Sequence, residues 1–251
     1  MEIRLVRHAT LAVRFHGVTV LVDPMLGDVG ANPPVPNSPN PRPNPLVPLP
    51  QPGPALMDGV DLVLITHTHR DHFDDAAAAL VPKHLPLIGQ PEYAAKFRGL
   101  GFTRVYPVTD LLRWEGIEVH RTGGQHGVGE VGRRMAPVSG FALRAPGERT
   151  LYIPGDTVWC REVEEALRLH APAVTVVNAG AAQFLEGGPI TMTAEDVIDV
   201  ARRAQGTKIV AVHMEAINHC VLTRAALASS SAAAGISDRV WIPRDGESKS
   251  F

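Results

Sequence analysis

Residues 66–72, which read THTHRDH, place three histidines and one aspartate within seven positions. They follow the apolar run VDLVLI at 60–65, which predicts a buried strand. Side chains alternate along an extended backbone, so His67 and His69 point the same way and can reach one metal ion. Asp71 and His72 are adjacent, are expected to diverge as the next helix begins, and suit a second ion nearby. The segment therefore predicts the beginnings of two metal sites.

The ligand types restrict the metal. Imidazole mixed with carboxylate suits Zn, Fe, Mn or Ni better than Ca or Mg, which prefer all-oxygen sites. Cys160 and Cys220 form no CxxC pair and no disulfide framework, which excludes a thiolate zinc site and favours a reducing compartment. A histidine-rich strand end with ordinary hydrogen bonds is the alternative. The motif supplies at most two ligands per ion, so the others must come from elsewhere.

Three more polar residues follow apolar strands or stand in glycine-rich turns. They are His126 in TGGQHG, Asp156 in LYIPGDT, and His213 after IVAV. Strand ends and glycine turns meet on one rim of a sandwich, where sites are normally built. Taken singly, such an aspartate is usually a turn or a helix cap, and such a histidine is usually solvated. Their joint order, HxHxDH, His, Asp, His, resembles the metallo-β-lactamase fold superfamily from Thr66 to His213.

This resemblance implies a complete set of metal ligands. The first ion would be held by His67, His69 and His126, the second by Asp71, His72 and His213, and Asp156 would bridge both. Two divalent ions are implied, with zinc expected and manganese or iron as alternatives. Asp23, which ends VTVLVD, matches an Asp-Pro of this superfamily that would orient a metal-bound imidazole, a strand-end turn being the alternative. RHATLAVRF, VDPML and HMEAINH look most like the branch containing ascorbate-phosphate lactonase.

Two such ions imply hydrolysis. Ions about 3.5 to 4 Å apart can hold a bridging water, lower its pKa toward ~7 and present hydroxide to an electrophilic carbon or phosphorus. Two divalent ions, two carboxylates and one hydroxide leave a charge of about +1, which would attract a small anionic ester, lactone or phosphodiester. We assign catalytic roles to Asp71 and to His219, the latter as leaving-group acid, with His8 as the alternative acid. The candidates for contacting an anionic substrate are Arg70, Arg133 and Arg134.

The order of elements predicts an α/β fold. Strands over 2–7, 10–15 and 18–22 open the chain as a meander, and from residue 61 strands alternate with helices. Two passes of strands followed by helices predict a single domain over residues 1–251. Its architecture would be a four-layer αββα sandwich of two mixed β-sheets with helices outside. The helices are predicted over 71–80, 91–99, 162–170, 193–204 and 223–234.

Residues 32–54 interrupt this order with 11 of the chain's 22 prolines. Proline fixes φ and removes a backbone donor, so we expect a stiff, extended loop. A 23-residue connection exceeds the usual length and is typical of a lid, a binding loop or a linker. Apolar residues in this segment and just after it, which include Leu46, Val47, Leu49 and Leu56, favour a lid or a subunit contact, so a homo-oligomer stays open.

Composition excludes several partners. The chain is 45% hydrophobic and 20% charged with a net charge of −2, which gives no bulk basic field for nucleic acid. No stretch approaches the roughly 20 apolar residues that span a membrane, and a cytoplasmic location is expected. The GxGxxG pattern at 127–132 lacks the strand and helix of a dinucleotide site, and we interpret it as a loop beside His126.

Two other enzyme classes remain within the resemblance. A mononuclear iron oxygenase of the persulfide-oxidising type uses similar ligands around one iron. A nuclease of the same superfamily would need an RNA-gripping module or a basic arm, and neither is visible in the sequence. A non-catalytic binding member would be expected to lack some ligands, whereas all seven are present.

Overall fold

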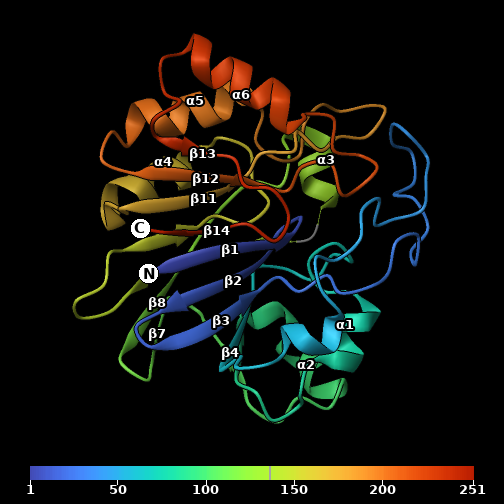
Figure 1. Cartoon of the computed structure of the whole chain (residues 1–251), viewed down its shortest axis with the longest axis vertical. Coiled ribbons are helices and arrows are strands. Elements are labelled where there is room, and N and C mark those ends of the chain that lie inside the picture. Colours follow the sequence, from blue (N-terminus) through green and yellow to red (C-terminus); the bar gives the residue numbers. More distant parts are fainter. Residues whose placement is uncertain (136) are drawn as a thin grey trace.

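The computed structural model describes residues 1–135 and 137–251, and its strands form two seven-stranded sheets within that part of the chain (Figure 1). In spatial order, the first sheet contains β14 (Ser248–Ser250), β1 (Glu2–Arg7), β2 (Thr10–Phe15), β3 (Val18–Val22), β4 (Leu62–Ile65), β5 (Leu87–Gly89) and β6 (Val105–Pro107). The second contains β13 (Val240–Trp241), β12 (Lys208–Val212), β11 (Val174–Asn178), β10 (Leu151–Ile153), β9 (Gly140–Arg144), β8 (Ile117–Thr122) and β7 (Leu111–Trp114).

The helices cover the outer faces of these sheets. Helices α1 (Asp75–Leu80) and α2 (Ala94–Gly99) lie on the first sheet, and α4 (Arg161–His170), α5 (Ala194–Arg203) and α6 (Arg224–Ala233) lie on the second (Figure 1). A short helix, α3 (Gly129–Arg134), and two 3-10 turns, η1 (Gly53–Leu56) and η2 (Pro91–Tyr93), complete the described elements. The predicted α/β class and four-layer αββα architecture are confirmed.

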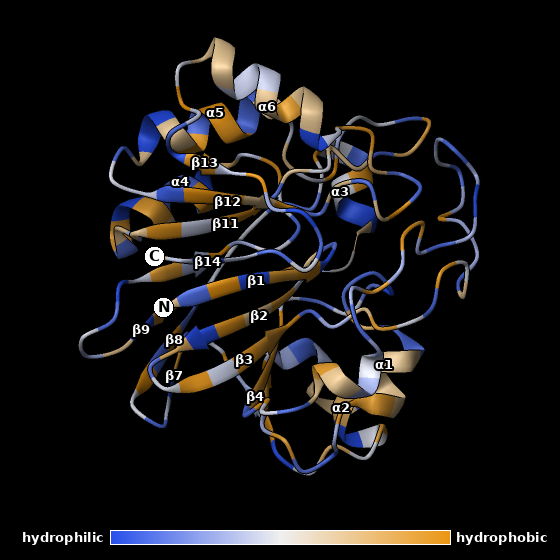
Figure 2. Cartoon of the chain, in the orientation of Figure 1, coloured by the Kyte–Doolittle hydropathy of each residue, from blue (hydrophilic) through white to orange (hydrophobic). Residues whose placement is uncertain are grey.

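Alternation along the strands explains the layers. In β4, Leu62 and Leu64 enter the core between the sheets, while Val63 and Ile65 face the core under α1 and α2. In β12, residues 210 and 212 face the other sheet, and residues 209 and 211 face the helices α4–α6. Strands buried on both faces are hydrophobic throughout, as the orange colour of β12 shows in Figure 2. Burying each such aliphatic side chain contributes about 1.5–3 kcal/mol.

Strand direction decides where the loops meet. In the first sheet β1 and β3 each pair antiparallel with β2, and β3 pairs parallel with β4. In the second sheet β8 and β10 each pair antiparallel with β9, and β10, β11 and β12 are parallel. The carboxyl ends of β1, β3 and β4 therefore share one edge, as do those of β8, β10, β11 and β12. This is the rim on which polar strand-end residues gather.

Three predicted elements differ from the structure. The helix predicted over 91–99 begins as the 3-10 turn η2 and is α-helical only from Ala94. The helix predicted over 71–80 begins only at Asp75, because the Asp74 side chain accepts a hydrogen bond from the Ala77 amide and caps it there. Residues 71–73 instead form a turn in which the amides of His72 and Phe73 both donate to the His69 carbonyl. The segment 127–132, interpreted as a loop, includes the first residues of α3. The short edge strands β6 and β14 were not predicted.

The proline-rich segment packs along the rim of its own chain. It forms no named strand, and its chain pairs with itself at an isolated bridge between Asn32 and Asn44. Leu56, just after the segment, is buried in the core beneath α1, and within the segment the Leu46 amide donates to the Ala216 carbonyl at 2.8 Å. The segment is therefore a packed wall, and a role in subunit contact stays a prediction. No helix in the described ranges is long and apolar enough to cross a membrane.

Candidate metal centre

The outer cluster consists of His67, His69 and His126. His67 and His69 follow β4 directly, and their ring centroids lie 4.6 Å apart. His126 comes from the loop after β8, and its Nε2 lies 3.3 Å from Nδ1 of His69. Two imidazole nitrogens at this distance repel each other unless a proton or a metal ion lies between them. The structure thus brings together the three predicted ligands of the first ion.

The inner cluster consists of Asp71, His72, His213 and His8. Nε2 of His213 lies 3.4 Å from Oδ2 of Asp71 and 3.3 Å from Nε2 of His72. These are the predicted ligands of the second ion. His8, predicted only as an alternative acid, places its Nε2 3.2 Å from Oδ2 of Asp71. Its motif RHAT carries no spacing that marks a ligand, which explains why sequence reasoning missed this position.

Asp156 lies between the two clusters. Its Oδ2 is 3.3 Å from Nε2 of His72 and 3.5 Å from Nε2 of His126, and its Oδ1 is 3.3 Å from Nε2 of His213. Oδ1 also accepts a hydrogen bond of 2.6 Å from Nδ2 of Asn178, which ends β11. The carboxylate therefore faces imidazoles of both clusters, as a bridging ligand requires; that role itself stays a prediction.

The donor set fits divalent ions. The ligand atoms within each cluster lie within 4.8 Å of one another, and zinc bonds to nitrogen and oxygen are about 2.0–2.2 Å long. Nε2 of His67 is buried and has no hydrogen-bond partner among the described residues. A buried imidazole nitrogen without a partner is costly, and a metal ion would satisfy it. Mixed imidazole and carboxylate donors suit zinc, manganese or iron.

Hydrogen bonds behind the ligands fix the ring orientations. Nδ1 of His72 donates to Oδ2 of Asp23 at 2.9 Å, and Asp23 in turn accepts from the amide and hydroxyl of Thr66. Nδ1 of His126 donates to the Ile190 carbonyl at 2.8 Å. These bonds leave Nε2 of both rings free for an ion. Asp23 makes the bond that the sequence predicted, whereas a backbone carbonyl such as that of Ile190 leaves no signal in a sequence.

Burial and neighbouring charges give the two clusters different protonation states. Burial alone would lower the pKa of His72, but the carboxylates of Asp156, Asp23 and Asp71 raise it to about 10. Burial would raise the pKa of Asp156, but His213 and His72 hold it well below its usual value. In the outer cluster, burial lowers the pKa of His67 well below its usual value. His72, and His213, whose pKa Asp156 likewise raises, therefore hold protons that an incoming cation would displace, which couples metal binding to proton release.

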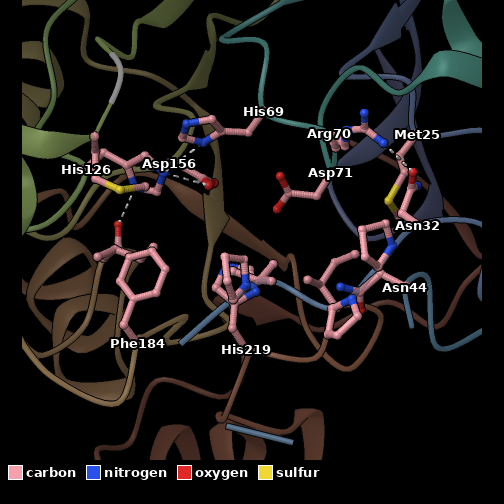
Figure 3. A pocket seen from close by; sticks show the side chains of 17 residues that line it. Met25, Asn32, Asn44, His69, Arg70, Asp71, His126, Asp156, Phe184 and His219 are labelled. Carbon is pink, nitrogen blue, oxygen red and sulfur yellow. Dashed lines mark hydrogen bonds and ion pairs between the residues drawn. The ribbon is translucent and has the colours of Figure 1, made fainter. Parts of the chain in front are cut away.

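A pocket of about 370 Å³ opens above these clusters (Figure 3). Its floor is formed by His69, His126, Asp71 and Asp156. One wall is formed by residues 32–36 and Asn44 of the proline-rich segment. The remaining lining is mainly apolar and includes Met25, Met135, Phe184, Ile190 and Ile217. Such a pocket suits a small ligand with an apolar body.

His219 lines this pocket and points toward its centre from the side opposite His69 (Figure 3). Burial lowers its pKa to about 4, so at neutral pH the ring is uncharged. A neutral imidazole can still donate a hydrogen bond from its N–H. The neutral ring can act on the leaving group as a hydrogen-bond donor but not as a charged acid. Its role as leaving-group acid stays a prediction.

The three arginines proposed to contact substrate lie in different places. Arg70 lines the pocket, where it donates to Oδ1 of Asn32 at 3.1 Å and pairs with Asp75 at 3.5 Å. Arg133 lines a neighbouring hollow beside His126. Arg134 pairs with Glu130 within α3. Arg70 is therefore the best placed of the three for contact with a ligand.

Asn218 fastens the proline-rich segment, which we call the proline wall (residues 32–54), to the rim. Its Oδ1 accepts from the Val35 amide at 2.9 Å and from Nδ2 of Asn44 at 2.7 Å. Its Nδ2 donates to Ser38 and to the Pro39 carbonyl, and its own amide donates to Oδ1 of Asn44. We call this set of bonds the Asn218 clip. Sequence reasoning missed it, because its partners stand about 180 positions earlier in the chain.

Comparisons with known proteins agree with this geometry. Residues 19–214 match the family described as the beta-lactamase superfamily domain. The UPF0173 protein YddR of Bacillus subtilis (strain 168) is 39% identical over 254 residues, covering 100% of both chains. A UPF0173 metal-dependent hydrolase of Azorhizobium caulinodans is 25% identical and covers 99% of each.

Two solved structures superpose over the whole chain. The isothiocyanate hydrolase from Delia radicum gut bacteria has a TM-score of 0.95 and 38% identity, covering 100% of this chain and 99% of that one. A possible metal-dependent hydrolase from Veillonella parvula has a TM-score of 0.97 and 32% identity with the same coverage. A diiron β-hydroxylase from Streptomyces venezuelae, at 17% identity and a TM-score of 0.68, shares the fold over 54% of its length.

Proposed function

This chain belongs to the beta-lactamase superfamily and is a metal-dependent hydrolase, and from that premise we propose that it hydrolyses a small substrate with an apolar body over two divalent metal ions. The observation that carries the proposal is Asp156, which stands between two ligand clusters at the floor of an apolar-walled pocket. The imidazole and carboxylate donors of the two clusters support a two-metal hydrolytic centre.

Each group at the floor has a proposed task. When bound, the ions lower the pKa of a water molecule toward ~7 and stabilise developing negative charge. The outer and inner clusters would hold one ion each, and Asp156 would neutralise part of the charge of both. Asp71, whose carboxylate points into the middle of the pocket in Figure 3, accepts the proton that the attacking water loses. The N–H of His219 donates a hydrogen bond to the departing group.

Isothiocyanates are the substrate class that the pocket favours. They are neutral, carry an electrophilic carbon and present an apolar substituent, which the proline wall and Phe184 would cover. Water adds to the central carbon, and cleavage of the C–N bond then gives an amine and carbonyl sulfide. The likeness to an isothiocyanate hydrolase along the whole chain supports testing this class first.

A small anionic ester, lactone or phosphodiester is the second candidate. Arg70 at the pocket and the charge of about +1 on the loaded centre favour it. The apolar lining disfavours it, because a charged group buried against such side chains loses its hydration.

The decisive experiment combines metal quantification with a substrate panel. We expect two zinc or manganese ions per chain and release of benzylamine from benzyl isothiocyanate, lost with a chelator and restored by the metal. Phosphodiesters, lactones and thioesters complete the panel. One iron per chain with oxygen uptake would favour the oxygenase alternative. Full metal occupancy with no turnover of any of these compounds would refute the hydrolase proposal as stated.

A further inference from the structure

His8 occupies a conformation that its residue type rarely adopts. It lies in the turn between β1 and β2, has φ of 61° and is fully buried. Its carbonyl accepts a hydrogen bond of 2.9 Å from the amide of His213, which itself has φ of 68°. Left-handed backbone is unfavourable for residues with a Cβ and persists only where the surroundings enforce it, often at functional sites. Two histidines with left-handed backbone that are hydrogen-bonded to each other therefore indicate a functional constraint at this position.

The side chain of His8 is held in the inner cluster. Its ring packs on that of His213 with centroids 3.6 Å apart, and its Nε2 lies 3.2 Å from Oδ2 of Asp71. The ligand atoms of His8, Asp71, His72 and His213 all lie within 4.8 Å of one another. The strained turn therefore delivers a third imidazole to a group that already fits a divalent ion.

The two clusters differ in access to the pocket. His8, His72 and His213 have no exposed surface, and of the inner cluster the pocket is lined by Asp71 alone. In the outer cluster, His69 and His126 both line the pocket. Zinc sites closed by protein ligands are structural, whereas catalytic sites keep an open position.

We propose that His8 is a direct ligand of the ion held by the inner cluster, and that the two ions are inequivalent. The inner ion is enclosed by three imidazoles and Asp71, with Asp156 beside them. The outer ion faces the substrate. This inference rests on the proposed two-ion centre and not on the identity of the substrate.

The arrangement gives the inner ion a structural task. His8 comes from a turn of the first sheet, Asp71 and His72 follow β4 of the same sheet, and His213 follows β12 of the second sheet. The inner ion therefore joins the two sheets across their shared rim. It is expected to bind first and leave last when zinc is withdrawn stepwise.

A competition titration with a chromophoric chelator tests the assignment, with zinc as the probe. The variant is His8→Asn, since asparagine tolerates left-handed backbone. The matched control is His16→Asn, because His16 also has positive φ but lies in the turn between β2 and β3. In the parent protein we expect two affinities. His8→Asn should weaken the tighter one more than about 100-fold, because losing only a hydrogen-bond partner of a ligand costs about 10–100-fold. His16→Asn should match the parent.

Two further measurements guard against a folding defect. His8→Gly should regain the tighter site when imidazole is added, since free imidazole can fill the space of the lost ring. On the His126→Ala variant, whose outer cluster keeps only two imidazoles, loaded with one equivalent of zinc, X-ray absorption should count three imidazoles around the ion. Two imidazoles, or a loss of affinity within 100-fold that imidazole does not repair, would overturn the assignment. Failure to hydrolyse any substrate with the zinc pattern intact would refute only the proposed function.

Discussion

The floor and the wall of the pocket are built in different ways. Every ligand at the floor follows the carboxyl end of a strand, either directly or within a short loop, and several are fixed by hydrogen bonds to residues such as Asp23 and Asn178. The wall is an irregular proline-rich segment that the Asn218 clip fastens at one place. The sheets therefore position the metal ligands, and one loop determines which substrate shapes the pocket accepts. Floor and wall should respond separately to mutation.

The largest effect is expected at the floor, from Asp156→Asn. The substitution keeps the shape but removes the negative charge shared by the two clusters, so both ions lose a ligand. We expect at least one ion per chain to be lost and kcat/KM for benzyl isothiocyanate to fall more than about 10³-fold. Elemental analysis and amine release measure both.

Asp199→Asn on α5 is the matched control, since Asp199 forms a surface pair with Arg202 and belongs to neither ligand cluster. It should leave both quantities unchanged. If Asp156→Asn kept two tightly held ions and normal turnover, Asp156 would not be a bridging ligand. The expected contrast between mutations at the floor and at the wall would then also be wrong.

The floor was largely predictable from the sequence. The HxHxDH motif and the later His126, Asp156 and His213 each follow an apolar run, and parallel strands carry such residues to one edge. His8 was not predicted as a member of the inner cluster, because its place depends on a left-handed turn and on contact with the other sheet. The helix predicted from residue 71 begins only at Asp75, because Asp74 caps it and not an earlier residue.

The second-largest effect is expected from His219→Gln, at a residue that lines the pocket between the floor and the wall. Glutamine retains an N–H donor but cannot reproduce the position of the imidazole. We expect kcat to fall about 10²-fold, the lower range for a positioned proton donor, with metal content unchanged. Steady-state kinetics with metal analysis checks this. The exposed His84→Gln serves as control, and near-normal kcat in His219→Gln would end its proposed role.

A smaller effect is expected at the wall, from Asn218→Ala. Each lost hydrogen bond leaves a buried partner such as Asn44 unsatisfied, so unfolding free energy should fall by about 1–3 kcal/mol. The wall loosens, and KM for benzyl isothiocyanate should rise about 3–10-fold while two ions remain bound. Thermal melting, kinetics and metal analysis report these three quantities.

The exposed Asn40→Gly in the same segment keeps positive φ and should behave as the parent protein does. Loss of metal from Asn218→Ala would show instead that the wall braces the floor. For the wall, the sequence predicted only a stiff, extended loop. Its attachment to the rim could not be predicted, because hydrogen bonds between distant loops leave no local sequence pattern.

The smallest effect is expected from Arg70→Gln. The Arg70 side chain is 63% exposed, so solvent and salt screen its charge. We expect less than about a 2-fold change in KM for a neutral isothiocyanate and about a 3–5-fold rise for an anionic ester. Arg134, which pairs with Glu130, does not line this pocket, so Arg134→Gln should change neither. A large rise in KM for the neutral substrate would show that Arg70 acts through its contact with Asn32 and not through selection of charge.

The prolines of the wall have a thermodynamic consequence for ligand capture. A flexible lid must lose conformational entropy each time it closes on a ligand, and that loss weakens binding. In residues 32–36 the backbone is already restricted by Pro33, Pro34 and Pro36, and the Val35 amide is already bonded to Asn218. The entropy is therefore lost once, when the chain folds. A substrate therefore meets a binding surface that is already formed, and no loop has to become ordered when the substrate binds.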